Sequence, residues 1–582
     1  MKSQFGWLFF LTIMLFIGCN RTNTSVTLSE TIENQMPKPP VAQLKPHALT
    51  IFDDTRTDNY YWLRDRDSEE VLNYLRAENE YTSKVMAHTV DFQEQLFLEM
   101  KGRIKETDWS VPVKIDQYYY YSRTEEGKQY EIHCRKIGNM DGSEEILLDE
   151  NLIAADQEYM NLGDFSVSPD HNLLAYSVDY TGGEDFTIFI KNLATGELYP
   201  EQITGAYYSL EWANDNQTIF YTTVDEAMRP YKLFRHGIGS DPTQDTLVYH
   251  EADESYFLSI TKSKSHTYLF LDLESQVTNE LRYLDADNPA GEFKIIHPRE
   301  YRVEYSVIHH GERFFILTND DALNFKLMEA PVTAPEKANW SEIIGHQEKV
   351  KLDQIDVFKD FLIVVERDFG LRKILVYNLS ENDQYIIEFP EATYKISLDD
   401  NPDFNSNFLR FNYSSYITPN SVYDYNLITR ERELKKQDEV LGGYDPEDYE
   451  TARIFATARD GETIPISILY RKGMIRNGDN PLYLYGYGSY GYNTDPRFRS
   501  HRFSMVDRGF IYAIAHIRGS SYLGRSWYED GKFLNKMNTF NDLIDCADYL
   551  VEKNYTSPAK LAAVGGSAGG LLMGVIVNLR PN

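Results

Sequence analysis

Residues 561–573, Leu-Ala-Ala-Val-Gly-Gly-Ser-Ala-Gly-Gly-Leu-Leu-Met, carry the pattern that most directly indicates chemistry. The apolar start predicts a short buried strand, the Gly-x-Ser-x-Gly run a sharp turn, and the apolar end a helix. This order is that of a nucleophile elbow, which exposes a serine hydroxyl, here Ser567, at the end of a sheet. The helix N-terminus and the Ala568 N–H would then lie near a developing oxyanion. The alternative interpretation is a glycine-rich turn without chemistry.

An elbow needs a sheet behind it, and the region from about residue 441 to 582 supplies the pattern for one. Strands and helices alternate there, which predicts the N-terminal part of an α/β-hydrolase domain with a mainly parallel sheet. The predicted elements are a hairpin (452–458 and 464–469), two buried parallel strands (482–485 and 510–515) and a helix (540–551). Thr539 and Asp542 are the expected capping box of that helix.

Residues 111–440 show a different pattern, in which short runs of aromatic residues, or of alternating apolar and polar residues, lie between polar turns. Six of these runs recur about 45 to 55 residues apart, at 118–122, 173–177, 218–222, 267–271, 313–317 and 361–365. This period predicts a β-propeller of about seven four-stranded blades. A large array of β-sandwiches is the alternative.

The N-terminal residues predict export. Residues 1–19 resemble a lipoprotein signal peptide, with Lys2 before an apolar run and Cys19 as the residue that would be lipidated. An ordinary cleaved signal is the alternative. Residues 20–36 read as a flexible tether, and residues 37–110 as a helical segment that packs on the catalytic domain.

The composition limits the kinds of partner. The 582 residues carry a formal net charge of −32, which disfavours nucleic acid and anionic lipid and could attract cationic substrates. The three cysteines, at positions 19, 134 and 546, are far apart and show no metal-ligand spacing. No cofactor is implied, because hydrolysis requires only water and side chains.

Several ordered motifs resemble the prolyl oligopeptidase family of serine peptidases, and within it the oligopeptidase B (protease II) branch. They are Asp58–Leu63, Thr318–Phe325, Leu484–Tyr490, Ile517–Gly519, Trp527–Lys532, Asn538–Phe540 and Gly565–Gly570. The resemblance implies a hydrolase domain capped by a seven-bladed propeller that excludes folded proteins. The implied reaction is hydrolysis of short peptides after Arg or Lys.

The resemblance also implies roles for individual residues. Ser567 corresponds to the nucleophile that forms the acyl-enzyme, and the Ala568 N–H to one oxyanion donor. Tyr487 corresponds to the side-chain hydroxyl that supplies the other donor, a contribution of about 3 kcal/mol in such sites. Tyr490 falls where the family lines the pocket for the residue before the scissile bond. His516 and Arg518 are expected to serve the structure.

Three departures from the family pattern stand out. No Asp or His follows Ser567, although a triad on this fold has the order Ser, Asp, His. We therefore expect a truncated sequence of a normal enzyme, inactive as it stands, rather than a natural short form. Ser520-Ser-Tyr522 replaces the Gly-Gly-Glu usual in oligopeptidase B, and the export signal departs from the cytosolic location of familiar members. The signal predicts a lipid-anchored protein of the bacterial cell envelope, or one secreted to the periplasm.

Two other functions remain open on the sequence alone. One is a peptidase of the same fold with another preference, such as cleavage after proline. The other is a lipid-anchored propeller without catalysis that binds peptides or partner proteins, which the missing Asp and His would favour.

Overall fold

The computed structural model describes residues 37–381 and 383–582. The predicted leader (1–19), its lipidation residue Cys19 and the tether (20–36) lie outside the described residues. The described chain divides into two compact units, of which the first ends at Glu99 and the second begins at Met100. Within these ranges, no helix is both long enough and apolar enough to cross a bilayer.

The first unit combines a hairpin with helices. The elements are β1 (His47–Ile51), β2 (Asp54–Asp58), the 3-10 turn Tyr61–Arg64, α2 (Glu69–Met86), the 3-10 turn Ala87–Thr89 and α3 (Val90–Lys101). β1 and β2 pair antiparallel around Phe52 and Asp53, both with positive φ. Ser68 precedes α2, but its side chain makes no capping hydrogen bond. The packing of this segment on the hydrolase portion stays a prediction.

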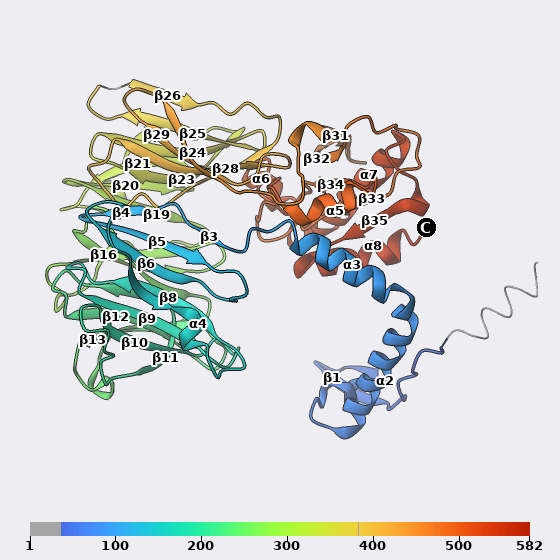
Figure 1. Ribbon diagram of the computed structural model, residues 1–582, viewed down its shortest axis with the longest axis horizontal. Coiled ribbons are helices and arrows are strands. Elements are labelled where there is room, and N and C mark those ends of the chain that lie inside the picture. The colour runs from blue at the N-terminus through green and yellow to red at the C-terminus, as the bar shows by residue number, and fades with distance from the viewer. Residues whose placement is uncertain (1–36, 382) are drawn as a thin grey trace, which may run out of the picture. The chain divides into compact units, whose positions relative to one another are not determined.

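The propeller strands run from Asp108 to Gln437 in the second unit (Figure 1). The first three blades comprise β3 (Asp108–Trp109), β4 (Val113–Ile115), β5 (Tyr118–Thr124), β6 (Ile132–Ile137), β7 (Glu145–Asp149), β8 (Asn161–Val167), β9 (Leu173–Asp179), β10 (Phe186–Asn192), β11 (Ile203–Trp212), β12 (Thr218–Val224), β13 (Pro230–Gly237) and β14 (Thr246–His250). A short helix, α4 (Glu150–Ile153), follows β7.

The remaining blades are four separate four-stranded sheets. They comprise β15 (Phe257–Lys262), β16 (Tyr268–Glu274), β17 (Asn279–Asp285), β18 (Lys294–His297), β19 (Tyr305–His310), β20 (Arg313–Thr318), β21 (Lys326–Pro331), β22 (Ser341–Ile344), β23 (Val350–Val357), β24 (Phe361–Asp368), β25 (Leu371–Asn378), β26 (Asp383–Ile387), β27 (Tyr394–Leu398), β28 (Phe408–Ser415), β29 (Ser421–Asn426) and β30 (Arg432–Gln437).

The blade count of seven follows from one long strand. The propeller strands form six sheets, but one of them has seven strands, β8 to β14. Within it, β11 pairs with β10 through Ile203 and Ala206, and with β12 mainly through Leu210–Trp212. This strand therefore ends the second blade and begins the third, so the predicted seven-bladed propeller is confirmed.

The recurring runs in the sequence are the second strands of successive blades, β5, β9, β12, β16, β20 and β24. Apart from β5, whose residues are all half-buried, these strands are largely buried on both faces because each blade packs between two others. In β16, for example, Leu271 packs toward the preceding blade with Phe220, and Phe270 toward the following blade with Phe314. Burial on both sides explains why these strands gave the clearest signal.

One carboxyl group lies within this apolar stacking. Asp272 is on the same face of β16 as Phe270, and its Oδ1 is buried without a hydrogen-bond partner among the described residues. Burial, together with the neighbouring Glu274 carboxylate, raises the pKa of Asp272 to about 7. The folded propeller therefore holds a proton that the unfolded chain releases near pH 4.

We expect Asp272→Asn to stabilise the protein more at pH 8 than at pH 5. The parent loses stability as pH rises from about 4 to about 7, because the unfolded chain gives up this proton first. The amide avoids this loss, so the gain should be small at pH 5 and about 1–3 kcal/mol at pH 8. Melting temperatures across this range would measure it.

Glu292→Gln provides the control, because Glu292 is exposed in the same blade and should show no such trend. Equal effects of Asp272→Asn on stability at pH 5 and pH 8 would contradict the raised pKa of Asp272.

The hydrolase portion follows the propeller. It contains β31 (Tyr449–Thr457), β32 (Thr463–Arg471), β33 (Leu482–Tyr485), α5 (Phe503–Val506), β34 (Ile511–Ala515), α6 (Arg525–Glu529), α7 (Lys536–Glu552), β35 (Leu561–Val564) and α8 (Ala568–Leu579). The sheet order is β31-β32-β34-β33-β35, with β33 parallel to both β34 and β35. This is the expected α/β-hydrolase scaffold.

The predicted capping box is wrong. α7 begins at Lys536, so Thr539 and Asp542 lie inside the helix. The Thr539 hydroxyl bonds the carbonyl oxygens of Arg518 and Gly531, and Asp542 accepts from Arg518. Tertiary contacts therefore use both side chains that local reasoning assigned to the helix end.

Candidate active site

Ser567 lies at a sharp turn between β35 and α8, as the elbow pattern predicts. Its φ of 52° and ψ of −122° are strained for a residue with a side chain, and the residue is exposed. The turn also requires glycine, because a Cβ on Gly565 would lie 2.5 Å from the Gly569 carbonyl oxygen. β35 itself is less buried than predicted. It pairs only with β33 among the described strands, and Ala562 is exposed.

The start of α8 offers a free donor beside the serine. Gly569 and Gly570 donate their N–H groups to the carbonyls of Gly566 and Ser567, both at 2.7 Å. The Ala568 N–H, the first of the helix, has no acceptor in the described part of the chain. The Ser567 hydroxyl likewise makes no hydrogen bond with another described residue.

Tyr487 belongs to the loop that packs on the elbow. β33 and β35 end side by side, with Tyr485 opposite Val564, and the Gly486 N–H donates to the Val564 carbonyl at 3.1 Å. A Cβ on Gly569 would lie 3.6 Å from the Tyr487 ring. The structure thus brings half-buried Tyr487 next to the first turn of the helix that follows Ser567.

Tyr490 lies on the same loop, at an exposed position. Its side chain is 67% exposed, and its φ is 57°. The next residue ties the loop to a neighbouring one, because the Gly491 N–H donates to Gly519 and the Gly491 carbonyl accepts from Ser521. Tyr490 is therefore open to solvent on a loop whose backbone is held on both sides.

Lys536 is a residue at this site that sequence reasoning missed. Its ammonium donates to the Gly488 carbonyl at 2.6 Å and to the Ser489 hydroxyl at 2.7 Å, so it clamps the loop directly after Tyr487. Lys536 is the first residue of α7, where the helix dipole disfavours a cation, and burial lowers its pKa. The sequence motifs on either side of Lys536 were recognised, but no sequence spacing indicates its contacts with Gly488 and Ser489, 48 and 47 residues earlier.

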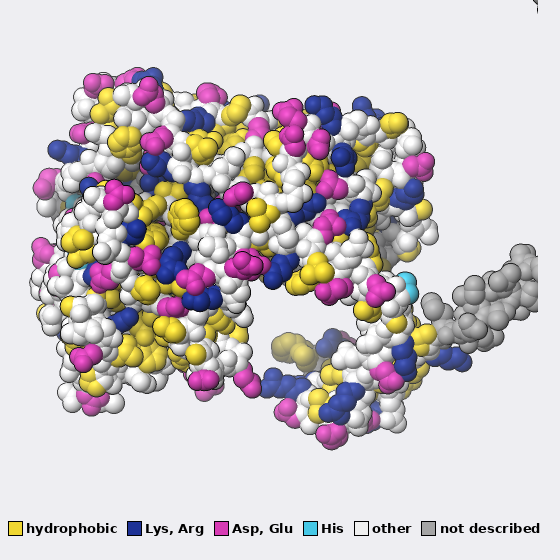
Figure 2. Space-filling model, viewed as in Figure 1, with side chains coloured by type: hydrophobic (Ala, Val, Ile, Leu, Met, Phe, Trp, Pro, Cys, Tyr) yellow, Lys and Arg dark blue, Asp and Glu magenta, His cyan; other side chains and the backbone are white. Residues whose placement is uncertain are grey.

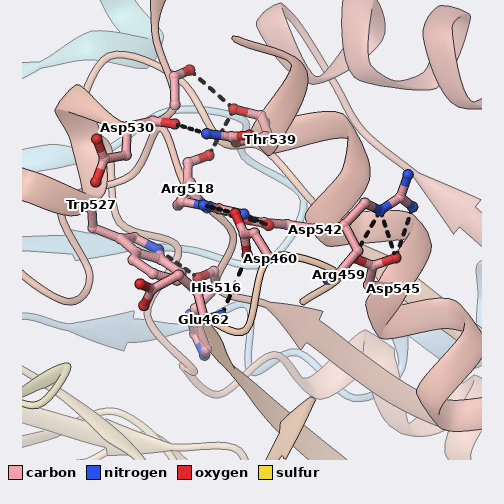
Figure 3. A network of polar contacts seen from close by, with 12 residues as sticks. Arg459, Asp460, Glu462, His516, Arg518, Trp527, Asp530, Thr539, Asp542 and Asp545 are labelled. Atoms are coloured by element: carbon pink, nitrogen blue, oxygen red, sulfur yellow. Dashed lines mark hydrogen bonds and ion pairs between the residues drawn. The ribbon is translucent and has the colours of Figure 1, made fainter. Parts of the chain in front are cut away.

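A buried ion pair holds the neighbouring loop (Figure 3). The Arg518 guanidinium contacts the Asp542 carboxylate through Nε at 2.9 Å and also reaches Asp460 at 2.6 Å. Burial raises the pKa of Asp542, and Arg518 offsets part of that effect. The backbones around the pair almost touch, since a Cβ on Gly531 would lie 2.0 Å from the Gly519 nitrogen.

A buried serine–histidine pair also exists in the hydrolase portion, between Ser467 Oγ and His516 Nε2 at 2.8 Å. Both residues are buried, and the pKa of His516 lies well below its usual range because of burial and nearby Arg453 and Arg367. Thr393 of the propeller bonds the same serine at 2.9 Å. Because both residues are buried, a peptide cannot reach them. The short Ser467–His516 distance is therefore not evidence that they act as nucleophile and base.

The unusual Ser520–Tyr522 triplet makes contacts between hydrolase and propeller. Tyr522 is buried and stacks on His516, with ring centroids 3.7 Å apart. A Cβ on Gly370, in the β24–β25 turn of the propeller, would lie 2.2 Å from the Tyr522 ring. Arg367, at the end of β24, bonds Asp495 of the hydrolase portion through two hydrogen bonds of 2.8 and 3.1 Å.

Comparisons with known proteins agree with this arrangement. The family description "Prolyl oligopeptidase, N-terminal beta-propeller domain" matches residues 39–438, and "Prolyl oligopeptidase family" matches residues 496–582. The chain belongs to the prolyl oligopeptidase family. It is therefore a serine peptidase related to protease 2 and oligopeptidase B.

The relatives cover most of the chain. "Dipeptidyl aminopeptidase BI" of Pseudoxanthomonas mexicana is 40% identical over 93% of this chain and 78% of its own length. "Protease 2" of Moraxella lacunata is 38% identical over 93% and 79%. The solved oligopeptidase B from Leishmania major superposes with a TM-score of 0.88 at 33% identity, covering 94% of this chain and 80% of its own.

Replacing Arg518 with Met should destabilise the hydrolase portion far more than replacing Arg459 with Met. The first change leaves the Asp542 carboxylate buried without its partner, a cost of about 3–5 kcal/mol. Arg459 pairs with Asp545 nearby, but its side chain is 51% exposed, so its loss should cost about 0–1 kcal/mol. Urea unfolding followed by circular dichroism measures both.

Arg518→Lys keeps the charge but loses the two-pronged contact, and its stability should fall between the parent and Arg518→Met. Similar losses of stability in the Arg518 and Arg459 variants would show that the buried ion pair matters no more to stability than the exposed one.

Proposed function

We propose that this protein is an endopeptidase that cleaves short peptides after Arg or Lys through an acyl-enzyme on Ser567. The observation that carries the proposal is the exposed, strained Ser567 at the start of α8, with an unused Ala568 N–H beside it. In this mechanism the hydroxyl attacks the peptide carbonyl, and its proton passes to a general base. The carbonyl oxygen becomes an oxyanion that the Ala568 N–H stabilises.

Tyr487 is the second oxyanion donor in this proposal. Its ring packs beside the first turn of α8, and a phenol held in place donates without reorganising during the reaction. Tyr490, exposed on the same loop, lines the pocket for the residue before the scissile bond. The general base is not assigned, because the described residues place no side chain against the Ser567 hydroxyl.

Two kinds of support favour Arg or Lys. Protease 2 and the oligopeptidase B structures are similar over most of this chain, and the structure from Trypanosoma brucei contains covalently bound antipain. The net charge of −32 also favours cationic peptides. On the face shown in Figure 2, acidic and basic side chains are interspersed rather than separated, so any such attraction acts through the overall charge.

A dipeptidyl aminopeptidase is the second candidate, because the relative from Pseudoxanthomonas mexicana bears that name. Such an enzyme would remove two residues from a free N-terminus. Cleavage after proline is a further alternative, since prolyl endopeptidases of Elizabethkingia are similar at 25% identity. A non-catalytic propeller that binds peptides would lack any reaction at Ser567.

We also propose a location for the enzyme, on the basis of residues 1–19. Lipidation of Cys19 would hold it in the bacterial cell envelope, where it would act on peptides outside the cytoplasm. Incorporation of labelled palmitate that Cys19→Ala abolishes would support this location.

Ser567→Ala should abolish both peptide hydrolysis and labelling by a serine-reactive fluorophosphonate. The protein to test is that expressed from the complete reading frame that contains this sequence. Blocked amide reporters ending in Arg or Lys should be cleaved, and reporters ending in Pro or carrying a free N-terminal dipeptide should react at least tenfold more slowly. Ser467→Ala is the matched control, because this serine also contacts a histidine but is buried.

Faster release from the free dipeptide reporter would favour the aminopeptidase. Activity that survives Ser567→Ala but not Ser467→Ala would overturn the assignment of the nucleophile.

Lys536→Met should lower kcat by about tenfold with little change in KM, if its role is to position Tyr487. The clamp on Gly488 and Ser489 acts through the loop, so its loss should matter only while the phenol is present. In a Tyr487→Phe background the same change should cost less than about twofold. Lys553→Met is the control, because Lys553 is exposed and directly follows α7. Equal losses in both backgrounds would indicate a structural role unrelated to Tyr487.

A further inference from the structure

The loop that carries Tyr487 continues into residues 493–498, which few hydrogen bonds hold. No backbone N–H of these residues donates a hydrogen bond within the described chain. Phe498 anchors the far end, because only 5% of this residue is exposed and it belongs to the hydrolase core. Among the described residues, Asp495 makes the only side-chain hydrogen bonds of this segment. The position of the segment next to the candidate site therefore depends on Asp495.

The partner of Asp495 is Arg367, on strand β24 of the propeller. Two hydrogen bonds join its terminal nitrogens to the two carboxylate oxygens, at 2.8 and 3.1 Å, which is the paired geometry of a strong guanidinium–carboxylate contact. Only 2% of Arg367 is exposed. The contact between propeller and hydrolase portion is thus shielded from solvent and salt, and the loss of one partner is costly.

A second buried carboxylate holds Arg367 from the propeller side. Its Nε lies 3.3 Å from Asp353, and the same carboxylate accepts hydrogen bonds from Lys351 at 2.7 Å and Arg372 at 2.9 Å. Burial alone would raise the pKa of Asp353, but the three cations outweigh it and hold that pKa below its usual range. One carboxylate therefore serves three cations, and Arg367 obtains its second anionic partner from Asp495.

The same propeller turn supports the loop at a second place. Arg367 donates to the Gly370 carbonyl at 2.9 Å, and Gly370 is the residue against which the Tyr522 ring packs. The Ser521 N–H, next to Tyr522, donates to the Gly491 carbonyl at 3.1 Å. The turn that Arg367 closes is thus connected to the loop both before and after its tyrosine at position 492.

Tyr492 transmits these two supports to Tyr487. It lies in the sequence between Gly491 and Asp495. Its ring meets the Tyr487 ring edge-on, with centroids 5.5 Å apart, and its N–H donates to the Ser489 carbonyl at 3.0 Å. Tyr492 itself is 60% exposed, so the backbone on either side fixes its ring more than core packing does. A shift of Asp495 would therefore move Tyr492 and the Tyr487 phenol with it.

We propose that Arg367 is a positioning residue for the peptidase site, because it holds the loop from which Tyr487 donates to the oxyanion. This inference rests on the proposed function, in which Tyr487 is the second oxyanion donor. Arg367 acts through Asp495 and not on the substrate. An oxyanion donor is effective only when it is held in place before the reaction. The propeller thus contributes to the chemical step itself.

Asp495→Asn tests this role with little disturbance, because Arg367 keeps its other contacts. For a blocked amide reporter ending in Arg, we expect kcat to fall about tenfold and KM to change less than about twofold, since the donor is misplaced while binding is retained. In a Tyr487→Phe background, the same change should cost less than about twofold. Arg367→Lys keeps the charge but loses the paired contact, so it should show a smaller loss with the same dependence on Tyr487.

Glu304→Gln is the matched control. Glu304 of the propeller also pairs with the hydrolase portion, but with Arg525 of α6 at 2.7 Å and not with the loop of Tyr487. This change should lower kcat by less than about twofold, and equally with and without the Tyr487 phenol. Urea unfolding verifies that each variant is folded in the assay, and Arg367→Lys decides the question if Asp495→Asn fails to fold.

The outcomes separate this inference from the proposed function. Unchanged kcat in Asp495→Asn, or a loss that is the same with and without the Tyr487 phenol, would overturn the positioning role alone. No Ser567-dependent hydrolysis by the parent, or full activity of Tyr487→Phe, would overturn the proposed function and this inference with it.

Discussion

The buried contact between Arg518 and Asp542 is the interaction on which the candidate site depends. It links the loop after β34 to the middle of α7, and the loops around it pack with their backbones nearly touching. Such a pair contributes little net stability when formed, but its disruption leaves a charge in the interior. Thr539 bonds the Arg518 carbonyl, and Lys536, one turn earlier in α7, holds the loop that carries Tyr487. The ion pair therefore also helps to fix the position of Tyr487.

Close packing also explains why the site can hold unfavourable conformations. Ser567 and Tyr490 both have positive φ, which side chains other than glycine rarely adopt. Gly488 is confined between Thr539 and Ile517, where a Cβ would lie 2.4 Å from the Thr539 methyl group. Each strained residue is thus flanked by glycine-rich backbone that the sheet and α7 fix. The strain is concentrated where a hydroxyl must be exposed and a substrate must approach.

The sequence predicts what local patterns encode and misses what distant contacts create. The elbow was predictable because its strand, turn and helix adjoin, and the propeller because most of its second strands are buried on both faces. The capping box of Thr539 and Asp542 failed because tertiary partners took both side chains. Lys536 was missed for the same reason, since its partners lie 48 and 47 residues away. The roles of Ser567, Ala568 and Tyr487 themselves remain predictions that the geometry accommodates.

Charge connects the fold to the kind of substrate proposed. A chain with a net charge of −32 attracts cationic residues from a distance, but that attraction is not directional. Orientation of a bound peptide must therefore come from local contacts in the site. Tyr490 is the side chain that the proposal assigns to this task, because it is exposed on the loop whose preceding residues Lys536 holds.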